Sequence, residues 1–195
     1  MRRSRHCILA KSVAVLLAFL AGTMAVRGFR GDLVAQESPA QSAPLRNYGV
    51  VWEHKLSRSG MPSDDSGWRW LRGQGVKSVV TFRPQNDVDY NKFGFQHVLR
   101  IPMRGDPPTD QQAEEFLRFI QDPANQPAHF HCTAGKSRTG IMAALARYSI
   151  DGWPMQRALE EARLYRGGED LSANRVAWLN NWAAKHKPGS YRIKP

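Results

Sequence analysis

The sequence is poor in cysteine: its 195 residues contain only two, Cys7 and Cys132. Two thiols cannot build a disulfide framework or a cysteine-rich zinc site, because both require several cysteines at set spacings. Cys7 precedes an apolar run near the N-terminus, so Cys132 is the one thiol in the rest of the chain. A lone thiol is either inert and buried or a nucleophile, and its neighbours decide between the two.

Acidic residues are absent from residues 1–30, which contain six basic residues. The whole chain has 28 Lys and Arg against 17 Asp and Glu, and its formal net charge is +11. Beyond residue 30 the basic surplus falls to five, with 22 basic and 17 acidic residues. A strongly basic chain raises nucleic acid as a partner. Because more than half of the excess lies in residues 1–30, we expect a membrane partner there and no nucleic acid.

An apolar run of full transmembrane length is also missing. Between Ser12 and Val26 there are 15 uncharged, mostly apolar residues, whereas a transmembrane helix needs roughly 20. The pattern favours a signal peptide in residues 1–30, with Thr23-Met24-Ala25 as its cleavage site, or a single N-terminal membrane anchor. In both cases the protein is exported or membrane-tethered, and its folded domain lies outside the cytoplasm. A buried N-terminal helix is the remaining alternative.

The sequence contains no internal repeat and divides simply after residue 30. Residues 31–46 mix Gln, Glu, Ser, Pro and Ala without an apolar period, which predicts a flexible tether. Residues 47–187 are the expected folded domain, and their length of about 140 residues is near the usual size of a domain. Residues 188–195 are expected to form a short tail.

Strand-like and helix-like segments alternate through the expected domain. Strands are predicted at residues 48–52, 55–59, 76–82, 96–101 and 128–131. Helices are predicted at residues 68–72, 109–120, 141–148, 154–164 and 172–182. Five tryptophans, mostly at helical spacing, are expected in the core: Trp68, Trp70, Trp153, Trp178 and Trp182. The order predicts an α/β fold with a central, mostly parallel sheet flanked by helices on both faces.

One loop brings a strand, a thiol and an arginine together. The segment HCTAGKSRTG, from His131 to Gly140, leads from an expected strand directly into a helix. Backbone N–H groups of such a loop point into one concavity, and the helix N-terminus adds positive potential, so a thiol there loses its proton near neutral pH. The guanidinium of Arg138, six residues after Cys132, matches two oxygens of a phosphate. The sequence therefore predicts a phosphate-binding loop between a strand and a helix, with a thiolate at its floor.

Glycine is absent at position 130, and this excludes a nucleotide-binding loop. Residues 134–137 match the end of the pattern Gly-x4-Gly-Lys-Ser, but Phe130 stands where the first glycine is required. A buried, inert cysteine with an incidental arginine remains the alternative for this segment. No His, Asp and Glu cluster has metal-ligand spacing, so we expect no metal and no other cofactor.

The loop resembles the signature of the cysteine-dependent protein tyrosine phosphatases, which is His-Cys, five residues, Arg, then Ser or Thr. The matching positions are His131, Cys132, Gly135, Arg138 and Thr139. The short domain is similar to the compact, dual-specificity-like branch of that superfamily. The resemblance implies a phosphatase that hydrolyses phosphate monoesters through a phosphocysteine intermediate.

The resemblance also implies a role for each loop residue. Cys132 would attack phosphorus, Arg138 would bind the phosphate oxygens, and Thr139 would stabilise the departing thiolate. His131 would orient the loop from behind. Substrate phosphate would be bound along the backbone of the loop, at Thr133, Ala134, Gly135, Lys136 and Ser137.

The leaving group of such a reaction needs a proton, which a loop carboxylate supplies in related phosphatases. Asp106 is the first candidate, because it lies 26 residues before the cysteine, between an expected strand and an expected helix. Asp110 is the second candidate. Asp87 and Asp89, on a different loop, are the third.

Lys136 adds a second cation to the loop and bears on the substrate. The segment Ala-Gly-Lys-x-Arg-Thr-Gly is similar to that of the phosphoinositide 3-phosphatases, but those carry a further lysine where this chain has Thr133. We therefore expect phosphorylated proteins as the first substrate class, and phosphoinositides or inositol polyphosphates as the alternative. A catalytically silent phosphate-binding module is a further alternative. The rim of the site has four candidate arginines: Arg58, Arg83, Arg100 and Arg104.

Overall fold

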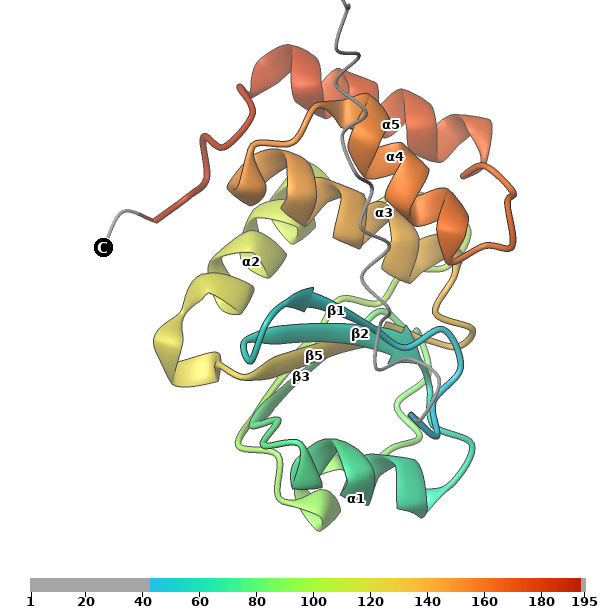
Figure 1. Ribbon diagram of the computed structural model, residues 1–195, viewed down its shortest axis with the longest axis vertical. Helices are drawn as coiled ribbons and strands as arrows, with labels where there is room; N and C mark the ends of the chain where they lie inside the picture. The colour runs from blue at the N-terminus through green and yellow to red at the C-terminus, as the bar shows by residue number, and fades with distance from the viewer. Residues whose placement is uncertain (1–42, 194–195) are drawn as a thin grey trace, which may run out of the picture. The chain divides into compact units, whose positions relative to one another are not determined.

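The computed structural model describes residues 43–193 (Figure 1). The predicted signal peptide or membrane anchor lies outside these residues, as does most of the predicted tether. Within residues 43–193, no helix combines the length and the apolar character needed to cross a membrane.

A five-stranded sheet with the order β1-β2-β5-β3-β4 forms the centre of the described region (Figure 1). Its strands are β1 (Gly49–Trp52), β2 (Leu56–Gly60), β3 (Ser78–Thr81), β4 (His97–Arg100) and β5 (Ala128–Cys132). Strand β1 pairs antiparallel with β2, and every other neighbouring pair is parallel. All five residues of the central strand β5 are buried, as is usual for parallel strands covered on both faces.

Helices cover both faces of the sheet (Figure 1). On one face lies α1 (Asp65–Gly73), together with a 3-10 turn at Tyr90–Phe93. The other face carries α2 (Asp110–Gln121), α3 (Ser137–Ala146), α4 (Met155–Leu164) and α5 (Ala173–Lys185). A short 3-10 turn at Pro123–Asn125 precedes β5, and a π-helical turn at Arg147–Asp151 continues α3. The predicted α/β class, with a mostly parallel sheet between two helical layers, is confirmed.

Helix α2 begins and packs as its sequence pattern predicts. Thr109 Oγ1 accepts a hydrogen bond from the N–H of Gln112 at 3.2 Å, and Gln112 Oε1 accepts one from the N–H of Thr109 at 2.9 Å. The two bonds form a capping box, which satisfies N–H groups that the first turn leaves free. Four apolar residues of this helix are completely buried: Ala113, Phe116, Leu117 and Ile120.

The tryptophans divide into two groups. Trp68 and Trp182 are buried, as predicted. Trp70 and Trp178 are partly exposed but pack against the core, whereas Trp153 belongs to neither core cluster, so its assignment to the core is wrong. The ring of Trp153 packs against two cations. The guanidinium carbons of Arg147 and Arg157 lie 4.4 Å and 3.7 Å from its centroid.

Packing continues past residues 47–187 at both ends of the described region. Leu45 is buried in the cluster of side chains around α1. At the other end, the N–H groups of Gly189 and Tyr191 donate to the carbonyls of Tyr148 and Ser149, each at 2.9 Å. Residues 45–46 and 188–192 therefore take part in the folded unit.

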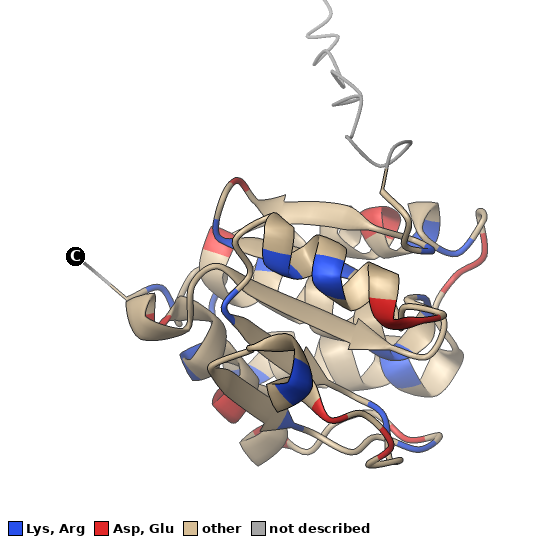
Figure 2. Ribbon diagram, turned by 90° about the horizontal axis from the view of Figure 1, so that it is seen from below, with Lys and Arg blue, Asp and Glu red and all other residues tan. Residues whose placement is uncertain are grey.

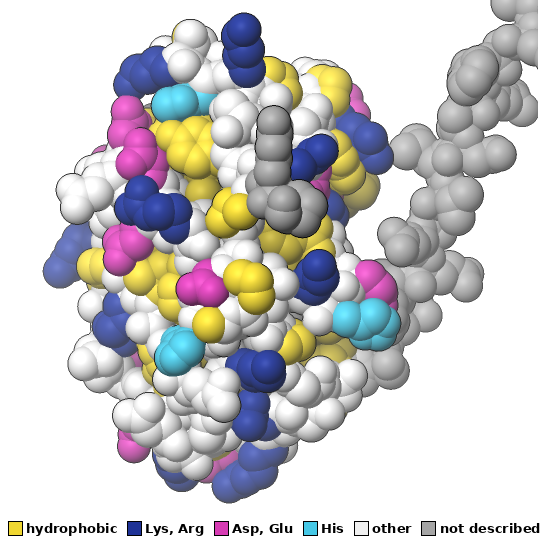
Figure 3. All heavy atoms as spheres, turned by 90° about the vertical axis from the view of Figure 1, so that its left-hand side faces the viewer, with side chains coloured by type: hydrophobic (Ala, Val, Ile, Leu, Met, Phe, Trp, Pro, Cys, Tyr) yellow, Lys and Arg dark blue, Asp and Glu magenta, His cyan; other side chains and the backbone are white. Residues whose placement is uncertain are grey.

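Charged residues of both signs are interspersed along the elements of the folded unit (Figure 2). On the face shown in Figure 3, which is turned toward α2 and the C-terminal segment, apolar, basic and acidic side chains alternate. The two most exposed large apolar residues in the described region, Leu164 and Ile193, come from different elements.

Candidate active site

The nucleophile predicted from the sequence lies at the end of the central strand. Cys132 is the last residue of β5, and its side chain is buried. Residues 133–136 then turn directly into α3, so that the loop meets the N-terminus of a helix as predicted. Because β2, β5 and β3 are parallel, the loops that follow these three strands meet at the same edge of the sheet.

The carbonyl groups of the loop are turned outward by donors from the rest of the protein. The N–H of Met61 donates to Cys132 O at 2.8 Å and to Thr133 O at 3.2 Å. Ala134 O accepts from Asn47 Nδ2 at 2.8 Å, and Gly135 O accepts from an arginine side chain at 2.9 Å. Since N–H and C=O groups point in opposite directions across a peptide, this arrangement directs N–H groups toward the inner side of the loop.

Gly135 is required by both its backbone conformation and its neighbours. Its φ is +71°, in the left-handed region that side chains disfavour. A Cβ at this position would lie 2.4 Å from the backbone N of Gly60 and 2.6 Å from the carbonyl carbon of Ser59. The end of β2 therefore supports the loop directly from below.

Several groups around Cys132 favour its thiolate. Burial raises the pKa of this thiol, but the hydroxyl and N–H of Thr139, the charge of Arg138 and the N–H of Gly135 together lower the pKa below its usual value. The Thr139 hydroxyl is buried and has no other hydrogen-bond partner among the described residues. A buried thiol with a lowered pKa is a prepared nucleophile.

Arg138 joins three segments at the edge of the sheet. Its Nη1 donates to the carbonyls of Phe82, after β3, and Met103, after β4, both at 3.2 Å. Its Nη2 donates to Thr133 Oγ1 within the loop at 3.0 Å. The guanidinium is thereby held beside the thiol, where it can bind two oxygens of one phosphate.

His131 is buried behind the loop and is neutral. Burial is the chief cause that lowers the pKa of His131 to about 3, and the charges of Arg83 and Arg138 lower it further. Its Nδ1 faces Cys132 O at 3.4 Å, so Nδ1 carries the proton and Nε2 accepts from the hydroxyl of Tyr90 at 2.9 Å. The edge of Trp68 packs against the same ring. This ring orients the loop and neither gives nor takes a proton near neutral pH.

The four candidate acids differ in the hydrogen bonds and ion pairs that their carboxylates make. Asp110 accepts a hydrogen bond from Lys185 Nζ of α5 at 2.8 Å. Asp87 accepts two hydrogen bonds from Arg83, one of them at 2.7 Å. Asp89 accepts a hydrogen bond from the N–H of Asn91 at 3.1 Å. Asp106, in contrast, makes no hydrogen bond or ion pair within residues 43–193. Asp106 is exposed, and both its charge and that of Cys132 raise the pKa of the same arginine, Arg175.

Arg58 was expected at the rim of the site, and the structure contradicts this. Its side chain is completely buried beneath the loop. Nη2 donates to Gly135 O at 2.9 Å, and the guanidinium carbon lies 4.0 Å from the ring centroid of Tyr165. The physical reason is that β2 is an interior strand between β1 and β5, so that all five of its residues are buried.

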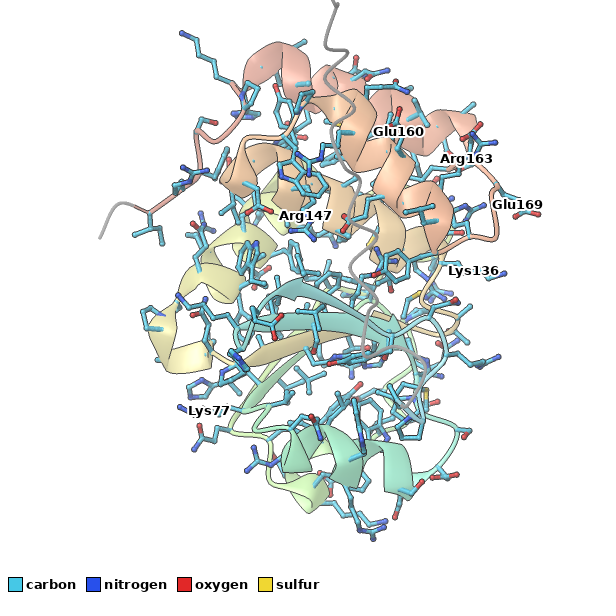
Figure 4. All side chains as sticks on the ribbon, viewed as in Figure 1. Lys77, Lys136, Arg147, Glu160, Arg163 and Glu169 are labelled. Atoms are coloured by element: carbon cyan, nitrogen blue, oxygen red, sulfur yellow. The ribbon has the colours of Figure 1, made fainter. Side chains whose placement is uncertain are left out.

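The other expected rim arginines have different surroundings. Arg83 is nearly buried and is bound to Asp87. Arg100 donates to the carbonyl of Gln85 at 2.9 Å, and Arg104 is exposed. Lys136 is exposed at the N-terminus of α3 and its side chain points away from the sheet (Figure 4).

Sequence reasoning missed three residues that contact the loops of the site. Asn47 binds the phosphate loop, as described above. Arg166, after α4, donates from Nη1 to Ser137 Oγ at the start of α3. Arg175, in the first turn of α5, donates from Nη2 to Gly105 O at 2.7 Å, next to Asp106. Each contact spans a long stretch of sequence, so no local pattern marks these residues. In residues 43–193, no group of three or more His, Cys, Asp or Glu side chains could hold a metal ion.

Comparisons with known sequences agree with this site. A family model described as "DSP-PTPase phosphatase fused to NAD+ Kinase" matches residues 46–153. The dual specificity protein phosphatase TpbA of Pseudomonas aeruginosa is 31% identical over 189 residues, which cover 86% of this chain and 83% of that protein. The inositol diphosphatase DSP3 of Arabidopsis thaliana is 28% identical over 128 residues, 61% of this chain and 62% of that one.

Solved structures share the same fold. Pseudomonas aeruginosa TpbA in complex with phosphotyrosine matches with a TM-score of 0.55 and 28% identity, over 68% of this chain and 82% of that chain. The core catalytic domain of the PP-IP phosphatase SIW14 from S. cerevisiae, in complex with citrate, matches with a TM-score of 0.61 and 22% identity, over 73% of this chain and 93% of that chain.

Proposed function

This chain belongs to the cysteine-dependent protein tyrosine phosphatase superfamily, in its compact dual-specificity-like branch, and we propose that it dephosphorylates phosphotyrosine in proteins. It is a phosphatase of phosphate monoesters that uses a cysteine nucleophile. One observation carries the residue assignment: the thiol of lowered pKa, the outward-turned loop carbonyls and the guanidinium of Arg138 surround a single position at the end of β5.

In the first step, the thiolate of Cys132 attacks phosphorus. The S–P bond forms while the bond from phosphorus to the leaving oxygen breaks. Arg138 and the N–H groups of the loop bind the other phosphate oxygens as their charge grows. Asp106, as a carboxylic acid, gives its proton to the leaving oxygen.

In the second step, water replaces the cysteine. The carboxylate of Asp106 takes a proton from the water as its oxygen bonds to phosphorus, and the S–P bond breaks. The thiolate of Cys132 leaves with the electron pair of that bond, stabilised by the hydroxyl of Thr139. Inorganic phosphate and the resting enzyme are the products.

Two relatives support two different substrate classes for this chain. TpbA is named a dual specificity protein phosphatase and is 31% identical, and the structure of TpbA matched here contains phosphotyrosine, which supports the protein substrate as the first choice. An inositol polyphosphate or phosphoinositide is the second candidate. It is favoured by the cations Lys136, Arg166 and Arg175 around the loop and by the inositol diphosphatase among the relatives.

Release of phosphate from matched substrates tests the proposal. The reduced protein is assayed with an aryl phosphate, a phosphotyrosine peptide and an inositol polyphosphate. Cys132→Ser is expected to abolish turnover of all three, whereas Cys7→Ser, which removes the other thiol, is expected to leave the rates unchanged. A peptide rate well above the inositol rate supports the protein substrate, and the reverse ratio favours the second candidate. Turnover that persists in Cys132→Ser would contradict the mechanism.

A further inference from the structure

The loop between β4 and α2, residues 101–109, is attached to the rest of the site by two arginines. Met103 O accepts from Arg138 Nη1 at 3.2 Å, and Gly105 O accepts from Arg175 Nη2 at 2.7 Å. Arg138 belongs to the phosphate loop, whereas Arg175 comes from α5, 70 residues beyond Gly105. Within the described chain, the bond from Arg175 is the one hydrogen bond made by residues 104–106.

The peptide that Arg175 holds is the one before Asp106. Gly105 has no atom within 4 Å of the place where a Cβ would stand, so no neighbouring side chain restricts its backbone. A glycine in open space has wide freedom in φ and ψ. The hydrogen bond to its carbonyl therefore sets the orientation of the segment from which the Asp106 side chain leaves.

The guanidinium of Arg175 makes hydrogen bonds but has no counter-ion among the described residues. Nη1 donates to Ser172 Oγ at 2.7 Å, and Nε is buried without a hydrogen-bond partner among the described residues. Burial and the charges of Arg166 and Arg138 lower the pKa of Arg175, whereas the charges of Asp106 and Cys132 raise it. A cation kept among like charges, without an ion pair in residues 43–193, is unfavourable unless it has another task.

We infer that Arg175 is a positioning residue, which holds the loop so that Asp106 reaches the leaving oxygen of the substrate. The inference rests on the proposed function, in which Asp106 is the general acid. Proton transfer requires the donor within hydrogen-bond reach of the leaving atom, and a displacement of about 1 Å can lower a rate about 100-fold.

If Arg175 positions Asp106, the loss of rate on removing Arg175 should depend on how strongly the leaving group needs a proton. A phenolate such as that of tyrosine has a conjugate acid of pKa about 10 and needs the proton as the P–O bond breaks. An activated aryl phosphate, such as a nitrophenyl ester, releases a stable anion that needs no proton. Loss of Arg175 should therefore slow the first step with the tyrosine substrate and spare the first step with the activated one.

The experiment compares kcat/KM for both substrates in the full chain and its variants, because kcat/KM reports the steps up to departure of the leaving group and excludes the later attack of water, in which Asp106 acts on the same intermediate for both substrates. We expect Arg175→Met to lower kcat/KM about 10- to 100-fold on the phosphotyrosine peptide and at most about 3-fold on the nitrophenyl ester. Arg175→Lys, which keeps one donor, should recover part of the loss. Lys185→Gln is the matched control, because it removes another contact of α5, the one to Asp110, and should leave the ratio of the two rates unchanged.

A double variant separates positioning from general destabilisation. If Arg175 acts through Asp106, then Arg175→Met adds little to the loss already caused by Asp106→Asn on the peptide. Equal losses on both substrates, or losses that multiply in the double variant, would overturn the inference while leaving the phosphatase function intact. An unmodified chain that turns over neither substrate would overturn the proposed function and this inference together.

Discussion

Arg58 is a buried cation that makes no ion pair within residues 43–193. Two of its nitrogens, Nε and Nη1, have no hydrogen-bond partner in the described part of the chain, and burial lowers the pKa of its guanidinium. Tyr165, Glu161 and the thiolate of Cys132 raise the pKa of Arg58, and the interaction with Cys132 must in turn favour the thiolate. A buried charge without a counter-ion contributes little to stability, so its value lies in the loop that it supports.

Replacing Arg58 with methionine should therefore separate stability from chemistry. We expect the free energy of unfolding to change by less than about 1 kcal/mol, because an unpaired buried charge is replaced by an apolar side chain. The value of kcat/KM should fall about tenfold, since the donor to Gly135 O is lost. The pKa of Cys132 should rise, because a nearby positive charge has gone.

Urea unfolding and the pH dependence of alkylation by iodoacetamide measure the two effects. The midpoint of alkylation should move to higher pH in Arg58→Met. Arg157→Met, an exposed arginine that packs on Trp153, is the control and should leave the midpoint in place. Strong destabilisation with an unchanged midpoint would show that Arg58 serves the fold.

At the scale of residues, the sequence predicts those site residues that lie close together along the chain. Cys132 and Arg138 lie six positions apart in one loop, so their pattern alone places them together. The contacts of Arg58 and Asn47 span 77 and 87 positions and end on backbone carbonyls, which any amino acid offers. The sequence ranks Asp106 before Asp110, but it gives no sign that Lys185 binds Asp110 from 75 positions away.

Strand β5 carries the nucleophile and two buried histidines on alternate residues. His129 lies between two serines of β2, with Nδ1 2.9 Å from Ser57 Oγ and Nε2 2.9 Å from Ser59 Oγ. Burial lowers the pKa of His129 well below its usual value, and the pKa of His131 falls to about 3. Both rings are therefore neutral in the folded protein at neutral pH.

The two histidines make stability depend on acidity. An unfolded histidine takes up a proton below pH about 6.5, whereas the folded His131 does so only near pH 3. Their contribution is fully present above pH about 6.5 and is lost as the pH falls toward 3. The free energy of unfolding should drop by about 1.4 kcal/mol per pH unit for each histidine in this range.

Urea unfolding between pH 7 and pH 4 measures this slope. His129→Asn should reduce the slope, because the unfolded chain then gains one proton fewer. His54→Gln removes an exposed histidine and should leave the slope unchanged. A stability that stays level on acidification to pH 5 would contradict the prediction.

At the scale of elements, the sequence predicts order and type better than boundaries and neighbours. Helix α1 begins at Asp65, earlier than predicted, because the side chain of Asp64 accepts from the N–H of Ser66 at 2.8 Å and caps the helix. Residues 48–52 and 55–59 were predicted as strands, and they form the antiparallel pair β1 and β2. The polar composition of residues 55–59 gave no sign of the second neighbour, β5, that makes β2 an interior strand.

For the whole molecule, export remains a proposal about residues 1–30. The basic residues and the apolar run there support a signal peptide or an anchor, and the thiol of Cys132 would then act outside the cytoplasm. We expect residues 1–46, fused to a reporter enzyme that is active only after export, to give activity. Fractionation of the full chain then distinguishes a released protein from a membrane-bound one.

Charged residues placed in the apolar run provide the control. Leu16→Arg together with Leu20→Arg interrupts the run and should abolish reporter activity. Activity that survives this change would show that the apolar run does not direct export. An intact unsubstituted fusion without activity would contradict the proposal and place the domain in the cytoplasm.

Strand β5 is also the piece that joins the sheet. Strands β1 and β2 form one pair and β3 and β4 another, and these pairs become neighbours only when β5 inserts between β2 and β3. Pairings between such distant segments close long loops, so they are entropically costly to form. Arg58 from β2 and the carbonyl of Phe82 after β3 both hold the phosphate loop, so we expect the pKa of Cys132 to fall only when β5 has joined the two pairs. A half-folded chain should then carry an ordinary cysteine. Catalytic competence thus reports that assembly is complete.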